Sequence, residues 1–145
     1  MTDVADPYNL RRFVDAQKSQ YAEVCAELRN GQKESHWMWF IFPQLQGLGR
    51  SQTAITFGIS SRQEASSYLE HPVLGPRLRE CTSLVNSIRG RSIRDILGCP
   101  DDLKFRSSMT LFSSVTSDDQ IFEDALRKYF AAEPDPLTLE LLKSM

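Results

Sequence analysis

Apolar residues recur at steps of three and four along most of this 145-residue chain, and no stretch alternates apolar and polar residues between hairpin turns. The first pattern is typical of amphipathic helices, whereas half-buried strands need the second. The longest stripe runs from about residue 9 to Asn30, with Pro7 before it and Gly31 after it. Residues 18–20 interrupt this stripe, which predicts a bend there. The sequence therefore predicts an all-α fold.

Further helices are expected where capping signals precede apolar stripes. Ser61 with Glu64, and Ser117 with Gln120, have the spacing of a capping box, and Asp135 precedes a proline that suits a first helical turn. No linker, repeat or low-complexity tract separates these segments. We expect one compact all-α domain over residues 1–145, with seven or eight helices and a loose N-terminal segment at 1–8.

Composition excludes several classes of protein. With 41% hydrophobic and 25% charged residues, the chain has the balance of an ordinary globule. A net charge of −2 argues against a dedicated nucleic-acid or anionic-membrane binder. The longest apolar run has six residues, far fewer than a bilayer span needs, and no secretory signal opens the chain. We therefore expect a cytoplasmic protein.

No metal or cofactor is expected from the sequence. Cys25, Cys81 and Cys99 are too far apart for a zinc knuckle or a redox pair, and they fit reduced thiols. Cys25 and Cys81 fall on apolar helical faces, whereas Cys99 lies in a turn. No histidine or carboxylate cluster has the spacing of metal ligands.

The segment SHWMWFIFPQLQGLGR, residues 35–50, does not fit an ordinary amphipathic helix. Its run 37–42 is apolar all the way round a helical wheel, which predicts a helix buried on every side, capped by Ser35 and ended by Pro43. A second interpretation is that the two tryptophans line a ligand pocket, with the following glutamines as polar contacts. The glycines beside Arg50 suit either a turn capped by Ser51 or an anion site.

A second unusual segment is DDLKFRSSMTLFSSV, residues 101–115, in which Lys104 and Ser108 fall inside an apolar arc. A lysine among core positions is uncommon unless it is paired or faces a cavity. Its stem can pack on the core while the ammonium reaches Asp101 or Asp102. Alternatively it presents a cation to a pocket, where a desolvated lysine can act as a nucleophile or base. His36 is a candidate general base for the same pocket.

Basic residues are concentrated in the middle of the chain. Residues 77–106 hold seven basic and four acidic side chains, and five of the basic ones are arginines between positions 77 and 94. A solvated helix face explains such a block, and an acidic protein partner is the functional alternative.

Four segments together resemble a known bacterial family: NLRRFVDAQ, SHWMWFIFPQLQGLGRS, YLEHPVLGPRLREC and PDDLKFRSSMTLF. The family is classed as a domain of unknown function, and some members carry the label calpastatin. The resemblance extends from Asn9 to about Leu142 and implies a small all-helical single domain of its own fold type. The label implies a calpain inhibitor, but inhibitors of that kind are disordered, whereas this chain has the pattern of a globule.

Three functions remain open on the sequence. The first is a helical domain that binds a small anionic, nucleotide-like ligand in an aromatic-lined pocket. The second is a hydrolase or N-glycosidase that uses His36 or Lys104 with Asp101 or Asp102, and the third is a protein-interaction module built on the arginines. The expected ligand-binding residues are Trp37, Trp39, Gln44, Arg50, Lys104 and Ser108.

Overall fold

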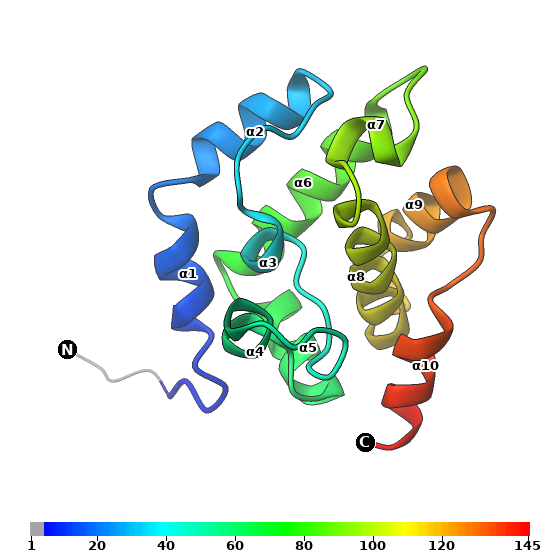
Figure 1. Ribbon diagram of the computed structural model, residues 1–145. Coiled ribbons are helices and arrows are strands. Elements are labelled where there is room, and N and C mark those ends of the chain that lie inside the picture. Colours follow the sequence, from blue (N-terminus) through cyan, green and yellow to red (C-terminus); the bar gives the residue numbers. More distant parts are fainter. Residues whose placement is uncertain (1–4) are drawn as a thin grey trace.

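The computed structural model describes residues 5–145, and this part of the chain folds into ten α-helices (Figure 1). The all-α prediction is confirmed, with two helices more than the upper number expected. The helices are α1 (Arg11–Gln17), α2 (Tyr21–Arg29), α3 (Met38–Ile41), α4 (Gln52–Phe57), α5 (Arg62–Glu70), α6 (Leu74–Ser87), α7 (Ile93–Leu97), α8 (Asp101–Val115), α9 (Ile121–Phe130) and α10 (Pro136–Lys143). None of these ten is long and apolar enough to cross a membrane.

The long N-terminal stripe forms two helices, because the chain leaves the helical path at residues 18–20, where a bend was predicted. Gly31, with a φ of +75°, adopts the left-handed conformation beyond the end of α2. At the other end, the Asp6 carboxylate accepts the backbone N–H groups of Leu10 and Arg11, at 2.8 and 3.0 Å. Residues 1–4 of the expected loose segment lie outside the described residues.

The two longest helices, α6 and α8, organise the packing. α6 contacts α2, α5 and α9, and α8 contacts α5, α7, α9 and α10. In Figure 1, α1 and α2 lie on one side and α8, α9 and α10 on the other, with α3 and α6 between them. α3 therefore lies where the two halves of the chain meet.

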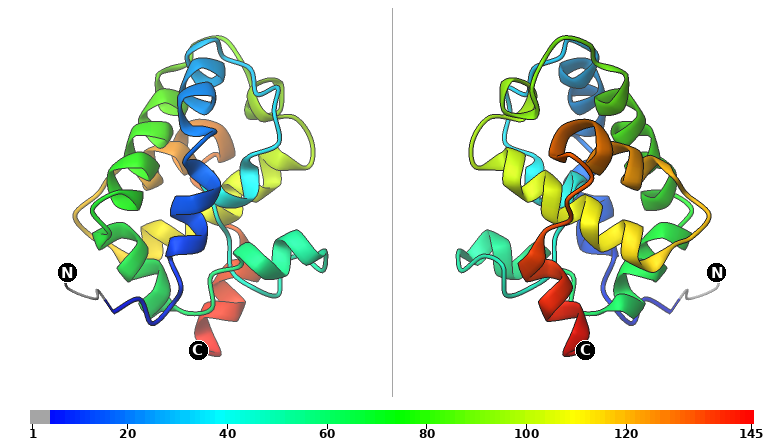
Figure 2. Two further views of the ribbon diagram at one scale, coloured as in Figure 1. Left: turned by 90° about the vertical axis from the view of Figure 1, so that its left-hand side faces the viewer. Right: turned by 90° about the vertical axis from the view of Figure 1, so that its right-hand side faces the viewer.

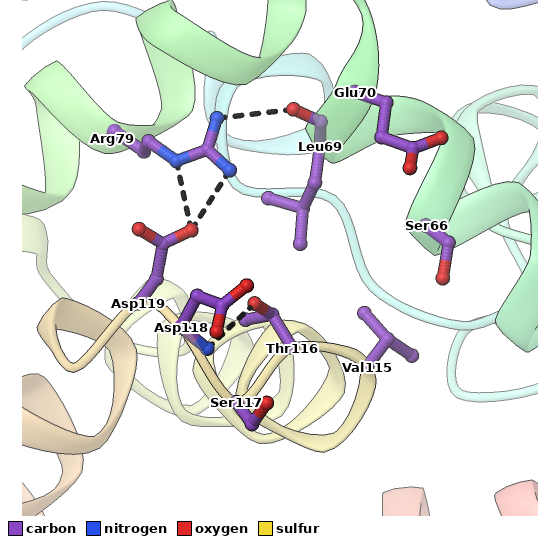
Figure 3. Close-up of a pocket in the computed structure, with 9 residues that line it drawn as sticks. All are labelled: Ser66, Leu69, Glu70, Arg79, Val115, Thr116, Ser117, Asp118 and Asp119. Atoms are coloured by element: carbon purple, nitrogen blue, oxygen red, sulfur yellow. Dashed lines mark hydrogen bonds and ion pairs between the residues drawn. The ribbon is translucent and has the colours of Figure 1, made fainter.

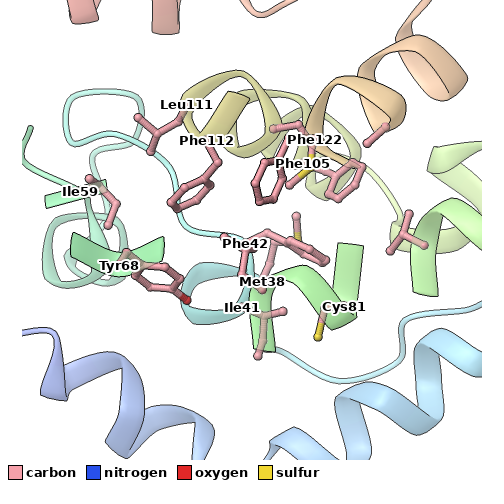
Figure 4. Close-up of a cluster of buried hydrophobic side chains, with 14 of the residues drawn as sticks. Met38, Ile41, Phe42, Ile59, Tyr68, Cys81, Phe105, Leu111, Phe112 and Phe122 are labelled. Carbon is pink, nitrogen blue, oxygen red and sulfur yellow. The ribbon is translucent and has the colours of Figure 1, made fainter. Parts of the chain in front are cut away.

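Aromatic side chains from both halves form the centre of the core (Figure 4). The rings of Phe42 and Phe105 meet edge to face, with centroids 4.9 Å apart and planes at 84°. Phe112 lies 5.4 Å from Tyr68 and 5.8 Å from Phe122, again between ring centroids. Such pairs add about 0.5–1.5 kcal/mol each beyond the burial of their area. They join α5, α8, α9 and the segment that follows α3.

The prediction of a central helix buried on every side is wrong. α3 has only one turn, and its sides are unequal: Trp37 is fully buried beside it, whereas Trp39 and Phe40 keep part of their surface in solvent. A helix of one turn contacts its neighbours on some sides only, and the side chains on its other sides stay partly in solvent. Ser35 does not cap this helix, because its hydroxyl donates to Glu27 instead, at 2.6 Å.

Most of the predicted helix starts are confirmed by cap hydrogen bonds. Ser51, Ser61 and Asp135 each accept a backbone N–H three residues further on, at 3.1, 3.1 and 3.0 Å. The capping box predicted at Ser117 is wrong, since α9 begins after Gln120 without a side-chain cap. Spacing alone did not distinguish this turn from a cap.

Residues 46–58, which contain α4, project from the body of the protein (Figure 2). Their base is closed by a parallel bridge, in which the Ile59 N–H donates to the Gln44 carbonyl and the Gln46 N–H donates to the Ile59 carbonyl, both at 2.9 Å. Arg12 holds the C-terminal end of the same segment, where its guanidinium donates to the carbonyls of Thr56 and Gly58, at 2.8 and 3.0 Å. This projecting segment, residues 46–58, is thus fixed at its base beside α3.

Candidate functional site

Trp39 on α3 and Lys104 on α8 meet at the surface. The Lys104 ammonium nitrogen lies 3.9 Å from the centroid of the Trp39 ring, within cation–π distance. Trp39 is half-buried, and the Lys104 side chain is 22% exposed. Two of the residues expected to bind a ligand are therefore brought together, across helices that are more than sixty positions apart in the sequence.

Asp101 is shared between two lysines. Its Oδ1 lies 3.4 Å from the Lys104 ammonium and its Oδ2 lies 3.0 Å from that of Lys33, whose side chain is only 8% exposed. The expected contact between Lys104 and Asp101 is present, yet it is the longer of the two ion pairs. One carboxylate cannot fully neutralise two ammonium groups, so Lys104 keeps attraction for a further anion.

Trp37 is placed differently from Trp39. It has no exposed surface, and its indole N–H donates to the Glu27 carboxylate at 2.9 Å. Glu27 also accepts the Ser35 hydroxyl and the backbone N–H groups of Glu34 and Ser35, at 2.6, 2.7 and 3.0 Å. Burial by itself raises the pKa of Glu27, but these four hydrogen bonds stabilise the charged form and lower the pKa to about 2. Trp37 and Glu27 thus hold the segment before α3 in place.

Gln44 and Trp39 both border Gly49. A Cβ built on Gly49 would lie 3.7 Å from both the Gln44 side-chain nitrogen and Cη2 of Trp39, so the two residues flank this glycine. Gln44 is 93% buried, and none of the residues 5–145 hydrogen bonds to its side-chain amide. Arg50, one position beyond Gly49, is exposed on the projecting segment.

Ser108 is fully buried, and its hydroxyl has no hydrogen-bond partner among the described residues. It follows Lys104 by four positions on α8, so both side chains lie on one face of that helix. A buried polar group without a partner costs about 1–3 kcal/mol, and each such group in a native protein needs an explanation. A ligand or an ordered water could supply the missing hydrogen bond to this hydroxyl, which lies one helical turn from Lys104.

His36 is exposed in the connection between α2 and α3. Within residues 5–145 it makes no side-chain hydrogen bond and no ion pair, with Lys104 and Asp101 included. His71 is structural, as its Nδ1 accepts the backbone N–H groups of Val73 and Leu74 at the start of α6, at 3.1 and 3.2 Å.

Two hollows lie away from this group of residues. The first has a volume of about 460 Å³ and lies between α5, α6 and the end of α8 (Figure 3). Arg79 crosses it, donating to Asp119 at 2.8 and 2.9 Å and to the Leu69 carbonyl at 3.0 Å. Neither hollow is lined by any of the six residues expected to bind a ligand.

The second hollow has a volume of about 340 Å³ and lies between the C-terminal ends of α2 and α6. Its polar lining includes Arg29, Arg89 and Arg91, and its apolar lining is Leu28, Leu84 and Ile88. Of the five arginines between positions 77 and 94, which form the arginine block, only Arg89 and Arg91 line this hollow.

Arg77 and Arg79 are used within the fold. The Arg77 guanidinium lies over the Tyr21 ring, with its carbon 4.6 Å from the centroid, while Arg79 holds Asp119. Arg89 and Arg91 instead line the second hollow. Glu27 and Arg29 were not predicted from the sequence as residues of either arrangement. Glu27 sits beside the apolar stripe of α2, an unusual place for a carboxylate and the one signal that pointed to it.

The fold and this surface define a small all-α single-domain protein with a lysine–tryptophan contact at the junction of its two halves. The chain belongs to the family described as protein of unknown function (DUF1810), whose model matches residues 7–142. The family resemblance is thereby confirmed. None of the curated proteins matches the sequence.

A solved structure shares both sequence and fold with this chain. It is the crystal structure of the conserved hypothetical protein Rv1873 from Mycobacterium tuberculosis, at 1.38 Å. The two chains are 55% identical, the match covers 95% of this chain and 99% of that one, and the TM-score is 0.94. This similarity supports the helical fold and shows that the chain has a bacterial relative.

Proposed function

We propose that this domain binds a small anionic ligand at the surface where Trp39 and Lys104 meet, with Gln44 and the buried hydroxyl of Ser108 as further polar groups. The observation that carries the proposal is the Lys104 ammonium, held over a half-buried indole and only partly neutralised by a carboxylate that it shares with Lys33. A cation beside an aromatic face suits a ligand with a negative group and a flat body, such as a nucleotide.

Two polar groups support this choice. The Ser108 hydroxyl is fully buried and lacks a hydrogen-bond partner among the described residues. Gln44 is 93% buried as a residue, and its side-chain amide borders Gly49 beside the Trp39 ring. A ligand that reaches between α3 and α8 would supply hydrogen-bond partners to these groups. Trp37, with its ring buried and its N–H bound to Glu27, acts in this proposal as support for α3.

The hydrolase or N-glycosidase alternative has less support. A general acid or base must come within about 3 Å of the reacting atom and exchange a proton there. Asp101 is engaged in ion pairs with Lys33 and Lys104, and among the described residues His36 forms no hydrogen bond or ion pair with either Asp101 or Lys104. Binding is therefore the function that this geometry supports best.

The test uses thermal unfolding with AMP, ribose 5-phosphate and inorganic phosphate as probes. We expect at least one probe to raise the melting temperature of the wild type, because a ligand that binds the folded state alone stabilises it. Each kcal/mol of stabilisation corresponds to about 2–4 °C for a domain of this size. Lys104→Met keeps most of the side-chain packing and removes the charge, so it should remove the part of the shift that arises from binding at Trp39 and Lys104.

Lys18→Met is the matched control, because Lys18 is exposed between α1 and α2. Tryptophan fluorescence gives an independent readout: ligand should change the emission of the wild type and of the control, but not that of Trp39→Phe. Equal temperature shifts in the wild type and in Lys104→Met would remove Lys104 from the site.

A further inference from the structure

We propose that the second hollow is a separate binding site for a small molecule that carries a phosphate monoester. Its geometry is independent of the surface around Trp39 and Lys104, and the proposal does not rest on the function proposed above. Three arginine residues line a space of about 340 Å³, close to the lower limit of small-molecule pockets in proteins.

The arginines come from two parts of the chain. Arg29 is in the last turn of α2, whereas Arg89 and Arg91 lie in the connection between α6 and α7. Within residues 5–145, no carboxylate forms an ion pair with any of the three. Arg29 and Arg89 also make no hydrogen bond there, so their donors face solvent. The fork of a guanidinium matches two oxygens of a phosphate, which is the chemistry this lining would recognise.

Arg91 is held in a fixed direction. Its Nη2 donates to the Asp95 carbonyl at 3.0 Å, and its Cδ lies 3.4 Å from where a Cβ on Gly31 would stand. Gly31 has a φ of +75°, so the glycine both ends α2 and leaves room for the arginine stem. A donor that is held before the ligand arrives loses less conformational entropy on binding.

The alternative role for such arginines is to compensate the negative C-terminal ends of the two helices. At α6 that role is already taken by Lys128, whose ammonium donates to the carbonyls of Asn86 and Ile88. The charge of Arg89 is therefore available to a ligand. Apolar surface from Leu28, Leu84 and Ile88 offers contact to the uncharged part of the molecule.

The experiment is calorimetric titration with AMP, ribose 5-phosphate, inorganic phosphate and adenosine, on the wild type and on Arg29→Gln and Arg89→Gln. We expect the phosphate-bearing probes to bind and adenosine not to bind. Each substitution should weaken binding about tenfold to a hundredfold, the range for a lost charged hydrogen bond. Comparing AMP with ribose 5-phosphate shows whether the base contributes.

Arg94→Gln is the matched control, since Arg94 is an exposed arginine at the same end of the molecule that does not line the hollow. It should bind as the wild type does. Lys104→Met should keep binding at this hollow, so that amide NMR shifts in both variants fall on residues 28–31 and 84–91. Equal weakening in Arg94→Gln would reduce the effect to general surface charge and overturn the proposal. Loss of binding in Lys104→Met alone would overturn it in favour of the Trp39 surface, and absence of any phosphate binding would overturn it outright.

Discussion

Glu27 shows how a single buried charge can be retained in a small core. Glu27 is 94% buried, and its carboxylate accepts hydrogen bonds from two consecutive positions of the α2–α3 connection, Glu34 and Ser35, and from the indole of Trp37. An ionised carboxylate without such donors would lose several kcal/mol on burial. Here the Glu27 carboxylate holds the residues that precede α3 and thereby helps to place Trp39 on that helix.

The stability of the protein should therefore depend on pH through Glu27. Its pKa falls from 4.5 to about 2 on folding, so the unfolded chain takes up the proton first as the solution is acidified. This contribution is complete above pH 4.5 and is lost as the pH falls from there toward 2. Glu27→Gln should lower the free energy of unfolding at pH 7 and flatten its profile in that window.

Urea unfolding at a series of pH values measures both effects. Glu34→Gln is the control, because the Glu34 side chain is exposed and only its backbone N–H contacts Glu27. A profile for Glu27→Gln that parallels the wild type would show that the carboxylate is not held as described.

At the scale of elements, α5 and α6 meet at a contact that requires a glycine. α5 ends at Glu70, and α6 starts four residues later. Between them, the His71 imidazole accepts the backbone N–H groups of Val73 and Leu74. Gly75 then lies directly against the Leu69 carbonyl, and a Cβ there would overlap this oxygen. The close approach lets Arg79, one turn further on, donate to the same carbonyl at 3.0 Å.

Gly75→Ala should destabilise the protein, although alanine favours a helix by about 1 kcal/mol over glycine. The clash involves backbone, which cannot move without separating the two helices, so we expect a net loss of about 1–3 kcal/mol. Chemical denaturation measures the difference. Ser83→Ala, at an exposed position of α6, is the control and should be neutral or slightly stabilising. A stable Gly75→Ala would mean that α5 and α6 can separate at little cost.

At the scale of the whole molecule, the three cysteines report on how completely the helices close the core. Cys25 on α2 and Cys81 on α6 are buried, whereas Cys99 is exposed before α8. Burial also raises the pKa of the Cys81 thiol, which disfavours the reactive thiolate.

Titration with a thiol reagent should therefore modify one cysteine rapidly in the native protein and the other two only as the protein unfolds. Cys99→Ser should remove the rapid phase and leave the slow one unchanged. Denaturant should accelerate the slow phase, because Cys25 and Cys81 become accessible through opening of the fold. Rapid modification of either buried thiol in native buffer would contradict the packing of α2 against α6.

Local features of the sequence were sufficient for the helical class and for most of the helix starts. The bend at residues 18–20 and the caps at Ser51, Ser61 and Asp135 follow from propensities and spacings that act within a few residues, so they could be predicted without knowing the fold. The pairing of Lys104 with Asp101 is of the same kind, since three positions on one helix bring the two side chains together.

Only the tertiary structure decided which sides of those helices meet. Trp37 and Trp39 are two positions apart in one apolar run, yet one is sealed against Glu27 and the other lies open beneath Lys104. The arginine block divides in the same way, between the fold and the second hollow. Helical period and capping are set by neighbours in the chain, whereas exposure and partners are set by contacts between residues far apart in sequence. For that reason the sequence by itself determined the helices and the family, and the packing of α2, α3, α6 and α8 determined the candidate sites.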